Sequence, residues 1–416
     1  MMSEWNIGTI SEVCSLVTDG SHYSPKSCDS GEYMVSVKDF KGFGFDFSNC
    51  KHISSDDYEK MKASGCIPEH GDILIGKDGA RFFEDIIIYN QPEKPALLSS
   101  IAILRCNPDI ILPQFLYYIC KNPIFKKDVR DNYGSGSAIP RIVLKDFKRM
   151  TISYPDLAEQ RRIVASLVAI DDRIALNTAI NDNLEQQAQA LFKSWFIDSA
   201  ESIEWQRGTF SKLIQSTLNG DWGKECPSGN NTEKVYCIRG ADIPDVKSGN
   251  KGKMPTRYII PKNYASKKLE AGDIVIEISG GSPTQSTGRC TAITQSLLER
   301  YDSGMVCTNF CKAIKPLSEY SLFVYYYWQY LYDKGAFFSY ENGTTGIKNL
   351  DFSGFIETEP IIIPPLKRIF DFNYYCQTIQ DQIFANGKQI EQLSQIRDTL
   401  LPKLMSGEID VSKVEL

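Results

Sequence analysis

The chain repeats its own sequence at an offset of about 200 residues. The segment EHGDILI (69–75) returns as EAGDIVI (270–276). The glycine-rich stretch GSGSAIPRIVLKDF (134–147) returns as NGTTGIKNLDFSGF (342–355). Because it occurs once in each half, it is interpreted as a loop of the repeated domain and not as the single phosphate-binding loop of an enzyme. A period of this length is far too long for a solenoid repeat, so each half is expected to hold its own domain.

Both halves show the same order of predicted elements. GDILIG and GDIVIEI are predicted strands that open on a Gly-Asp turn, and SIAILR and FCKAI alternate well enough to be strands. PQFLYYICK and SLFVYYYWQYL are predicted short amphipathic helices. Each half then has a strand that ends at a proline, Pro155 or Pro364, after which a helix can start.

This order predicts an α+β fold in which two globular mixed α/β domains are joined by two long helices, with the pseudo-twofold symmetry of a tandem repeat. A length of 416 residues supports more than one domain. The predicted boundaries are a first domain at 1–155, a first spacer helix at 156–198, a second domain at 199–365, a second spacer helix at 366–405 and a C-terminal tail at 406–416.

Both predicted spacer helices carry a heptad pattern. The seam positions superpose at an offset of 209, with Ile170, Ile174, Asn177, Leu184 and Leu191 on Ile379, Ile383, Asn386, Leu393 and Leu400. This pattern predicts a coiled coil, which is antiparallel because the second helix returns across the intervening domain. A spacer of about 40 residues would be roughly 60 Å long at ~1.5 Å per residue. Asn177 and Asn386 are either buried, where they would fix the helix register, or at the edge of the seam.

The net charge of −6 argues weakly against a nucleic-acid binder, but basic residues cluster locally. Residues 121–149 hold eight basic and three acidic side chains. Residues 247–268 hold seven basic side chains and no acidic one, with Tyr258 and Tyr264 among them. Each cluster suits a phosphate backbone, and each is equally consistent with a solvated lysine-rich loop.

The cysteine and histidine content favours a cytoplasmic protein with buried, reduced thiols over a zinc site. The twelve cysteines include no CxxC pair, and the three histidines, His22, His52 and His70, lie away from paired thiols. No apolar run is long enough to span a membrane, and the N-terminus lacks the basic and apolar regions of a signal peptide.

Three stretches resemble the specificity subunit of Type I restriction–modification systems: DGSHYSPKSCDSGEYMVSVKDFKG (19–42), PDLAEQRRIVASLVAIDDRIALNTAINDNLEQQAQALFKSWFID (155–198) and RDTLLPKLMSGEIDV (397–411). The resemblance covers essentially the whole chain, and the Pro-x-Leu-x-Glu-Gln-Arg-x-Ile start of the first spacer helix is its most specific element. It implies two target-recognition domains on a coiled-coil spacer, which bind a bipartite asymmetric sequence in double-stranded DNA. The second copy, PPLKRIF, departs from the pattern because it lacks the Glu-Gln found at 159–160.

The resemblance also implies partners that carry the chemistry. Two methylation subunits would complete an adenine methyltransferase, and nuclease/translocase subunits would complete the restriction enzyme. The chain itself contains no P-loop, no adenine-methyltransferase tetrapeptide and no two-carboxylate nuclease set, so it is predicted to be non-catalytic and to hold no metal. S-adenosylmethionine, ATP and Mg²⁺ are expected on the partner subunits.

Candidate DNA-contacting residues are those able to donate to phosphates and base edges. In the first domain these are Ser21, His22, Lys38, Lys77, Arg81, Ser135, Ser137 and Arg141. In the second domain they are Arg239, Gln285, Arg289, Thr344, Thr345 and Lys348. The repeat matches Lys38 with Arg239, and each candidate could instead be an exposed loop residue or a partner in a local turn.

Three other functions remain open at this point. The chain could be the DNA-binding subunit of a related methylation or phage-defence system that lacks a nuclease motor. It could be a scaffold whose two domains bind proteins, in which case it would show no salt-dependent affinity for DNA. A nucleotide-binding enzyme with a glycine-rich loop is the third, and failure to bind ATP would eliminate it.

Overall fold

The computed structural model describes residues 5–42, 44–134, 140–282, 285–343, 347–412 and 414. The chain divides into two compact units, called here the first unit (Met1–Asp171 with Gln395–Leu416) and the second unit (Asp172–Ser394). Each unit therefore contains one globular domain and one end of both long helices.

The first unit is built on a four-stranded antiparallel sheet in the order β2-β10-β7-β8. Its strands are β2 (Cys14–Asp19), β10 (Ile101–Cys106), β7 (Ile73–Gly76) and β8 (Ile86–Ile88). Ile73 and Ile75 pack in a core cluster with Phe115 of α3 (Pro113–Lys121). Leu74 points to the opposite face and packs with Val35. Burial on both faces explains why this strand is continuously apolar.

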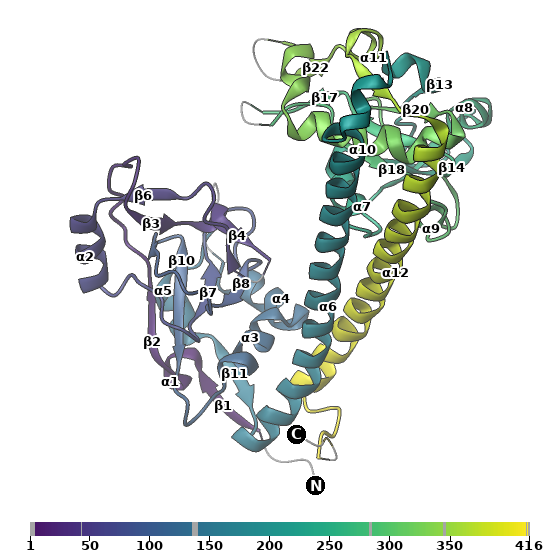
Figure 1. Cartoon of the computed structure of the whole chain (residues 1–416). Helices are drawn as coiled ribbons and strands as arrows, with labels where there is room; N and C mark the ends of the chain where they lie inside the picture. The colour runs from purple at the N-terminus through teal and green to yellow at the C-terminus, as the bar shows by residue number, and fades with distance from the viewer. Residues whose placement is uncertain are drawn as a thin grey trace. The chain divides into compact units, whose positions relative to one another are not determined.

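The other elements of the first unit surround this sheet. β3 (Glu32–Val35) pairs antiparallel with β6 (Lys51–Ile53) and parallel with β9 (Ala96–Leu97). α2 (Ser55–Ala63) packs on these strands through Met61, and Figure 1 shows it beside β3 and β6. The remaining elements are β1 (Asn6–Thr9), which pairs with β11 (Thr151–Tyr154), α1 (Ile10–Val13), η1 (Val37–Asp39), β4 (Phe40–Lys41), β5 (Gly44–Phe45), α4 (Pro123–Asn132) and α5 (Leu144–Arg149).

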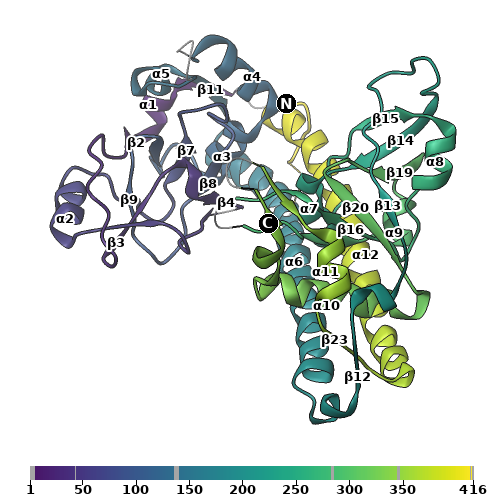
Figure 2. The ribbon, with the colours of Figure 1, turned by 90° about the horizontal axis from the view of Figure 1, so that it is seen from above.

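The second unit has the same central sheet, in the order β13-β20-β16-β18. Its strands are β13 (Ile214–Asn219), β20 (Cys311–Pro316), β16 (Ile274–Glu277) and β18 (Cys290–Ala292). A second sheet places β14 (Glu233–Ile238) between β15 (Thr256–Ile259) and β19 (Gly304–Cys307). α8 (Pro261–Lys267) lies alongside it in Figure 2 and packs through Tyr264.

An aromatic core supports the second unit. Trp328 of α10 (Ser321–Asp333) is fully buried and packs against Phe210, Phe337 and Phe355. The remaining elements are β12 (Gln206–Gly208), which pairs with β23 (Ile361–Ile363), β17 (Ser279–Gly280), β22 (Lys348–Leu350), β21 (Glu341–Asn342), α7 (Ile243–Lys247), α9 (Gln295–Leu298), α11 (Phe352–Thr358) and the short 3-10 turns η3 (Ala200–Glu204), η4 (Phe210–Lys212), η5 (Gly240–Asp242), η6 (Ser318–Tyr320) and η7 (Ala336–Tyr340).

The strand pairing repeats residue by residue in the two units. Leu104 pairs with Ile73 in the first unit, and the matching Ile314 pairs with Ile274 in the second. An ion pair at the start of these strands repeats as well. Arg105 Nε lies 2.9 Å from Asp72 Oδ1, and Lys315 Nζ lies 3.0 Å from Asp273 Oδ2. The tandem duplication and the mixed α/β fold predicted from the sequence are therefore confirmed.

Two long helices form the predicted spacer. α6 (Leu157–Phe192) has 36 residues and continues into a π-helical turn, η2 (Lys193–Ile197), while α12 (Leu366–Met405) has 40 residues. Within the second unit Asn177 donates to Gln389 and Asn386 donates to Asn181. Residue numbers rise along α6 from one contact to the next, while they fall along α12. The two helices are therefore antiparallel, as predicted. Figure 1 shows the two helices side by side.

The predicted seam positions lie in or beside the helix interface. Ile174, Asn177, Ile383 and Asn386 are buried, and the other seam residues are half-buried: Ile170, Leu184, Leu191, Ile379, Leu393 and Leu400. The two asparagines are thus inside the interface rather than at its edge. Polar side chains at such positions favour one helix register, because any other register leaves them without partners.

A hydrogen-bonded polar cluster surrounds Asn181 and Asn386 in the second unit. Asn386 Nδ2 donates to Asn181 Oδ1 at 2.8 Å, and Asn181 Nδ2 donates to the carbonyl of Ile383 at 2.9 Å. Asn181 Nδ2 also donates to the carbonyl of Ser248 at 3.1 Å. That last bond joins the loop after α7 to the helices, so the spacer and the second domain share one polar contact network.

A glycine in α12 allows this loop to approach the helix closely. A Cβ atom added at Gly387 would lie 1.8 Å from the carbonyl oxygen of Gly249. Gly249 itself has a φ of 82°, in the left-handed region that glycine tolerates best. Arg300 completes the contact, donating to the Gly249 carbonyl at 2.7 Å and pairing with Glu391 at 2.8 Å.

Candidate nucleic-acid interface

Polar side chains gather at one edge of the central sheet in each unit. β2 and β7 are both antiparallel to β10, so they run in the same direction and end at the same edge. β13 and β16 end together beside β20 in the same way. We call this the strand-end edge of each domain. Loops that leave one edge of a rigid sheet are favourable places for binding residues, since the strands fix their starting points.

In the first domain the strand-end edge is organised around Asp19, the last residue of β2. This carboxylate is 9% exposed and lies 3.3 Å from Lys77 Nζ and 3.5 Å from His22 Nε2. The amide of Ser21 donates to the Leu97 carbonyl at 2.7 Å, which fixes the turn after Asp19. The structure therefore brings two of the predicted residues, His22 and Lys77, to one carboxylate, with Ser21 in the turn that follows it.

Three further candidates of the first domain lie around this group. Arg141 forms an isolated bridge with Asp78, so it is adjacent to Lys77. Lys38 is exposed in η1, directly after β3. Arg81 lies further along the loop between β7 and β8 and forms an exposed ion pair of 2.7 Å with Asp85. Lys38 and Arg81 thus have exposed side chains, whereas Lys77 is buried.

In the second domain the strand-end edge is organised around Glu277, the last residue of β16. Arg289 donates to this carboxylate through two nitrogens, with Nε and Nη2 each 2.8 Å from an oxygen. This bidentate pairing raises the pKa of Arg289 further above its ordinary value. The amide of Gln285 lies beside the same guanidinium. Arg289 and Gln285 are therefore brought together, as candidate base-reading residues would need to be.

Lys348 and Glu341 form a second ion pair near this edge. Lys348 Nζ lies 2.7 Å from Glu341 Oε2. The other oxygen of Glu341 accepts from the backbone amide of Thr287 at 2.6 Å, which ties β21 to the loop that carries Gln285 and Arg289. β22 also pairs with β17, which follows Glu277 in the chain.

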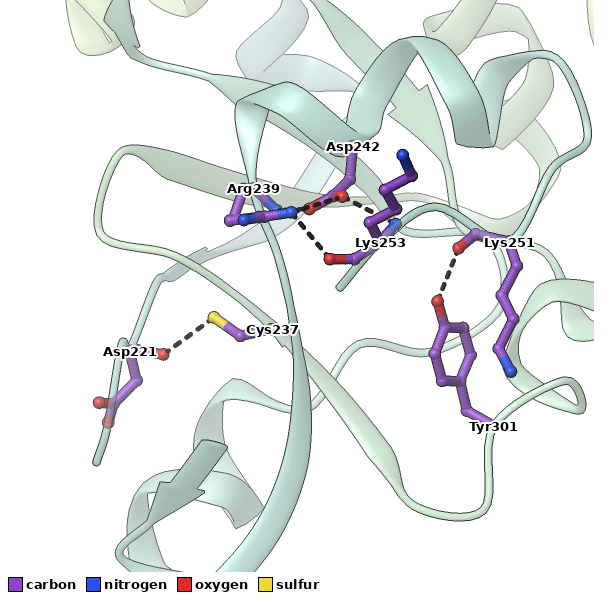
Figure 3. Close-up of polar contacts among 7 residues, drawn as sticks. All are labelled: Asp221, Cys237, Arg239, Asp242, Lys251, Lys253 and Tyr301. Atoms are coloured by element: carbon purple, nitrogen blue, oxygen red, sulfur yellow. Dashed lines mark hydrogen bonds and ion pairs between the residues drawn. The ribbon is translucent and has the colours of Figure 1, made fainter. Parts of the chain in front are cut away.

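Arg239 is held at the end of β14 by a buried carboxylate. Asp242 accepts from the backbone amide of Arg239 at 3.0 Å and from its Nε at 2.9 Å (Figure 3). The guanidinium also donates to the carbonyl of Lys253 at 2.8 Å. In the first unit Ser36 occupies this capping position, with Asp39 as the matching carboxylate. The predicted correspondence between Lys38 and Arg239 is therefore wrong, because short-string alignment misplaced it.

Four candidates lie outside the described residues: Ser135, Ser137, Thr344 and Thr345. They belong to the two copies of the glycine-rich loop with which the internal repeat was recognised.

Sequence reasoning missed the acidic residues that hold the cations. Asp19, Asp242, Glu277 and Glu341 each bind a predicted DNA-contacting side chain, although a carboxylate is not itself a donor to DNA. One signal was available, since the repeat aligns Glu277 with Gly76 and so marks it as specific to the second domain. The structure thus changes the interpretation of these cations from free to internally paired groups.

The basic stretch at 247–268 separates into paired and exposed side chains. Arg257 pairs with Glu225 at 3.1 Å, and Lys267 pairs with Asp221 at 3.2 Å. Lys253 is exposed, and its ammonium group has no ion pair within the described part of the chain. Figure 3 draws no contact from its ammonium group to the other residues shown. Part of this stretch therefore stabilises the fold, and part is available to an anionic ligand.

The thiols are mostly buried, with two exceptions. Ten of the twelve cysteines are buried, but Cys28 and Cys226 are exposed, which corrects the prediction that all thiols are buried. Burial raises the pKa of Cys237 to about 12. Over the described residues, no cluster of three or more His, Cys, Asp or Glu side chains is placed to hold a metal ion. No helix among those residues is long and apolar enough to cross a membrane.

The chain is thus a two-domain protein in which two long antiparallel helices accompany two versions of one polar sheet edge. Residues 2–186 match the family described as Type I restriction modification DNA specificity domain. The chain is 29% identical over 339 residues to the Type I restriction enzyme MjaIX specificity subunit of Methanocaldococcus jannaschii, covering 74% of this chain and 71% of that protein. It is 23% identical over 417 residues to the Type I restriction enzyme HindI specificity subunit of Haemophilus influenzae, covering 82% and 86%.

The fold agrees with a solved structure of the same kind. The crystal structure of the Type-I restriction-modification system S subunit from M. genitalium matches with a TM-score of 0.51 and 17% identity, covering 97% of this chain and 96% of that one. The chain is therefore similar to specificity subunits of Type I restriction–modification systems, which is the resemblance expected from its sequence.

Proposed function

We propose that this chain is a non-catalytic subunit that recognises a bipartite, asymmetric site in double-stranded DNA. The observation that carries this proposal is the strand-end edge, which occurs once in each domain on the same strand pairing but with different side chains. Where the first domain has Ser21 and Lys77, the aligned positions of the second domain are Asp221 and Ile278. Different donors and acceptors on one backbone frame suit two half-sites of different sequence.

In this proposal the chemistry belongs to the partners. Two methylation subunits would bind S-adenosylmethionine and modify adenine at the recognised site. Nuclease/translocase subunits, which use ATP and Mg²⁺, would join them for restriction. The complex would act in the cytoplasm. The names of the relatives support the role of the chain as the part that sets specificity.

Methylome sequencing tests the two-half-site proposal directly. When the chain is expressed with its methylation subunits in a host free of other adenine methylation, methylated adenines are expected in two specified tracts separated by a fixed unspecified spacer. The same subunits without this chain provide the control and should leave the motif unmodified. A single contiguous motif would contradict the proposal that each domain reads its own half-site.

Lys253→Ala tests whether the exposed part of the basic stretch contacts phosphate. Loss of one phosphate contact should reduce the slope of log affinity against log salt concentration by about 0.9, equally for specific and unrelated DNA. Stability should change by less than about 0.5 kcal/mol, because the side chain is exposed and unpaired. Lys388→Ala, exposed on α12, is the matched control. An unchanged slope for Lys253→Ala would remove this residue from the interface.

A further inference from the structure

A cavity of about 560 Å³ lies in the first unit where α3 and α4 meet the ends of α6 and α12. Its lining includes Tyr117, Tyr118 and Lys121 of α3, Lys126 and Arg130 of α4, and Arg397 of α12. The three cations on α3 and α4 belong to the basic cluster at 121–149 that the sequence singled out. They are distant from the strand-end edge in the chain, and the recognition proposal gives them no role.

One positive charge in this cavity has no carboxylate partner in the part of the chain that the structure describes. Lys126 pairs with Glu84 at 2.8 Å, and Arg130 pairs with the same carboxylate. Arg397 pairs with Asp171 at 3.0 Å and with Asp398 at 2.8 Å. The lining therefore holds four cations and three carboxylates, and the group left over is Lys121. Its ammonium lies 5.4 Å from the centre of the Tyr117 ring and forms no ion pair with any described residue.

The surroundings of Lys121 favour an anion. Burial lowers the pKa of Lys121 to about 8, with further lowering by Lys126 and Arg397 and opposing contributions from Asp171 and Asp85. An ammonium without a counter-charge in a half-buried site is costly, and a bound anion would remove that cost. Pro123, the first residue of α4, also lines the cavity, and the first turn of α4 has no acidic residue to satisfy its positive end.

The second unit has a cavity at the matching place of the repeat. This cavity, of about 340 Å³, is lined by Tyr326 and Lys334, which align with Tyr118 and Lys126. Gln329 replaces Lys121 in the aligned sequence, but it does not line this cavity; it is 3% exposed and accepts a hydrogen bond from Gln189 at 3.2 Å. The described lining of the second cavity therefore has no counterpart of Lys121, and the argument for an anion applies to the first unit.

We propose that the cavity beside Lys121 binds a phosphate group. The ammonium of Lys121 and the nearby guanidinium of Arg130 would donate to the phosphate oxygens. The phosphate could come from the DNA backbone, in which case the site deepens the recognition role proposed above. It could equally come from a small free phosphate compound.

The test compares Lys121→Gln with Lys121→Arg and with Lys127→Gln in the complex with methylation subunits. Lys127 is exposed on α4 and does not line the cavity, so Lys127→Gln is the matched control. Calorimetry with inorganic pyrophosphate is expected to show binding to the wild-type complex. Loss of one charge-assisted hydrogen bond should weaken it about tenfold or more in Lys121→Gln. Lys121→Arg should retain most of the affinity, because the positive charge is kept.

Salt-dependent DNA binding distinguishes the two sources of phosphate. A slope reduced by about 0.9 in Lys121→Gln, on both specific and unrelated duplexes, assigns the site to a DNA phosphate. An unchanged slope with weakened pyrophosphate binding assigns it to a small phosphate compound.

Equal behaviour of Lys121→Gln and Lys127→Gln in both assays overturns the proposal. Impaired assembly with the methylation subunits, without any phosphate effect, also overturns it and assigns the cavity to a carboxylate of a partner protein. If the wild-type complex fails to bind DNA, the recognition proposal fails, while pyrophosphate binding still tests the cavity.

Discussion

Arg289→Ala is expected to lower the free energy of unfolding by about 3–5 kcal/mol, far more than an ordinary loop substitution. Its guanidinium makes two hydrogen bonds of 2.8 Å with Glu277, which is 6% exposed. Removal of the arginine leaves a buried carboxylate without its counter-charge. Urea unfolding of the wild type and the variant, followed by circular dichroism, gives the difference.

The physical reason can be tested by removing the carboxylate as well. The double variant Arg289→Ala with Glu277→Gln should recover a large part of the lost stability, because no charge then remains buried. Arg81→Ala is the matched control, since Arg81 is 75% exposed and its ion pair with Asp85 is worth about 0–1 kcal/mol. If Arg289→Ala costs no more than Arg81→Ala, the pair with Glu277 does not support the second domain.

This result affects how specificity experiments on Arg289 are interpreted. From its sequence alone, Arg289→Ala should alter recognition of the second half-site only. The structure adds that the same substitution disturbs the end of β16, where Glu277 is located. Comparison with the Glu277→Gln single variant, which retains the arginine, separates loss of a base contact from loss of the strand-end geometry.

Gly387→Ala is expected to destabilise the second unit by about 1–3 kcal/mol, although alanine is the better helix former by about 1 kcal/mol. The sign reverses because the new methyl group would lie 1.8 Å from the Gly249 carbonyl oxygen. Relief of that clash requires the loop to leave the helix. The loop would then lose the hydrogen bonds that Asn181 and Arg300 donate to it. Chemical unfolding of the full chain measures the change.

Lys388→Ala provides the control for this substitution. Lys388 is exposed and adjacent to Gly387, so its replacement changes helix propensity without touching the loop, and stability should change by less than about 0.5 kcal/mol. If Gly387→Ala instead raises stability by the ~1 kcal/mol of its helix propensity, the loop at 248–250 is not seated on α12.

Much of the architecture could be predicted from the sequence because it depends on local patterns. The residue alternation in SIAILR and FCKAI predicts two strands. The structure contains them as β10 and β20. The aromatic segments PQFLYYICK and SLFVYYYWQYL form α3 and α10, as expected. The heptads predicted an antiparallel helix pair, and Asn181 pairs with Asn386 inside it. Each of these patterns is set by neighbours within one element or by the offset between the two copies.

The candidate site was predicted less completely. Ser21, His22 and Lys77 do lie together, since they follow strands that end at one edge. The sequence did not indicate that Lys77 is buried against Asp19, which lies on another strand. Alignment of short strings also misplaced Lys38 relative to Arg239, because the backbone cap, rather than residue similarity, marks the matching positions.

The sequence by itself determined the duplicated plan and the spacer helices, because periodicity and repetition are properties of the chain. Only the tertiary structure decided which cations are free and which are neutralised. Among the described residues Lys121 forms no ion pair, whereas Arg397 pairs with two carboxylates, although both are simply basic residues in the sequence. Likewise, only packing shows that Gly387 must lack a side chain. Charge pairing and close contact depend on segments far apart in the chain, and folding alone brings those segments together.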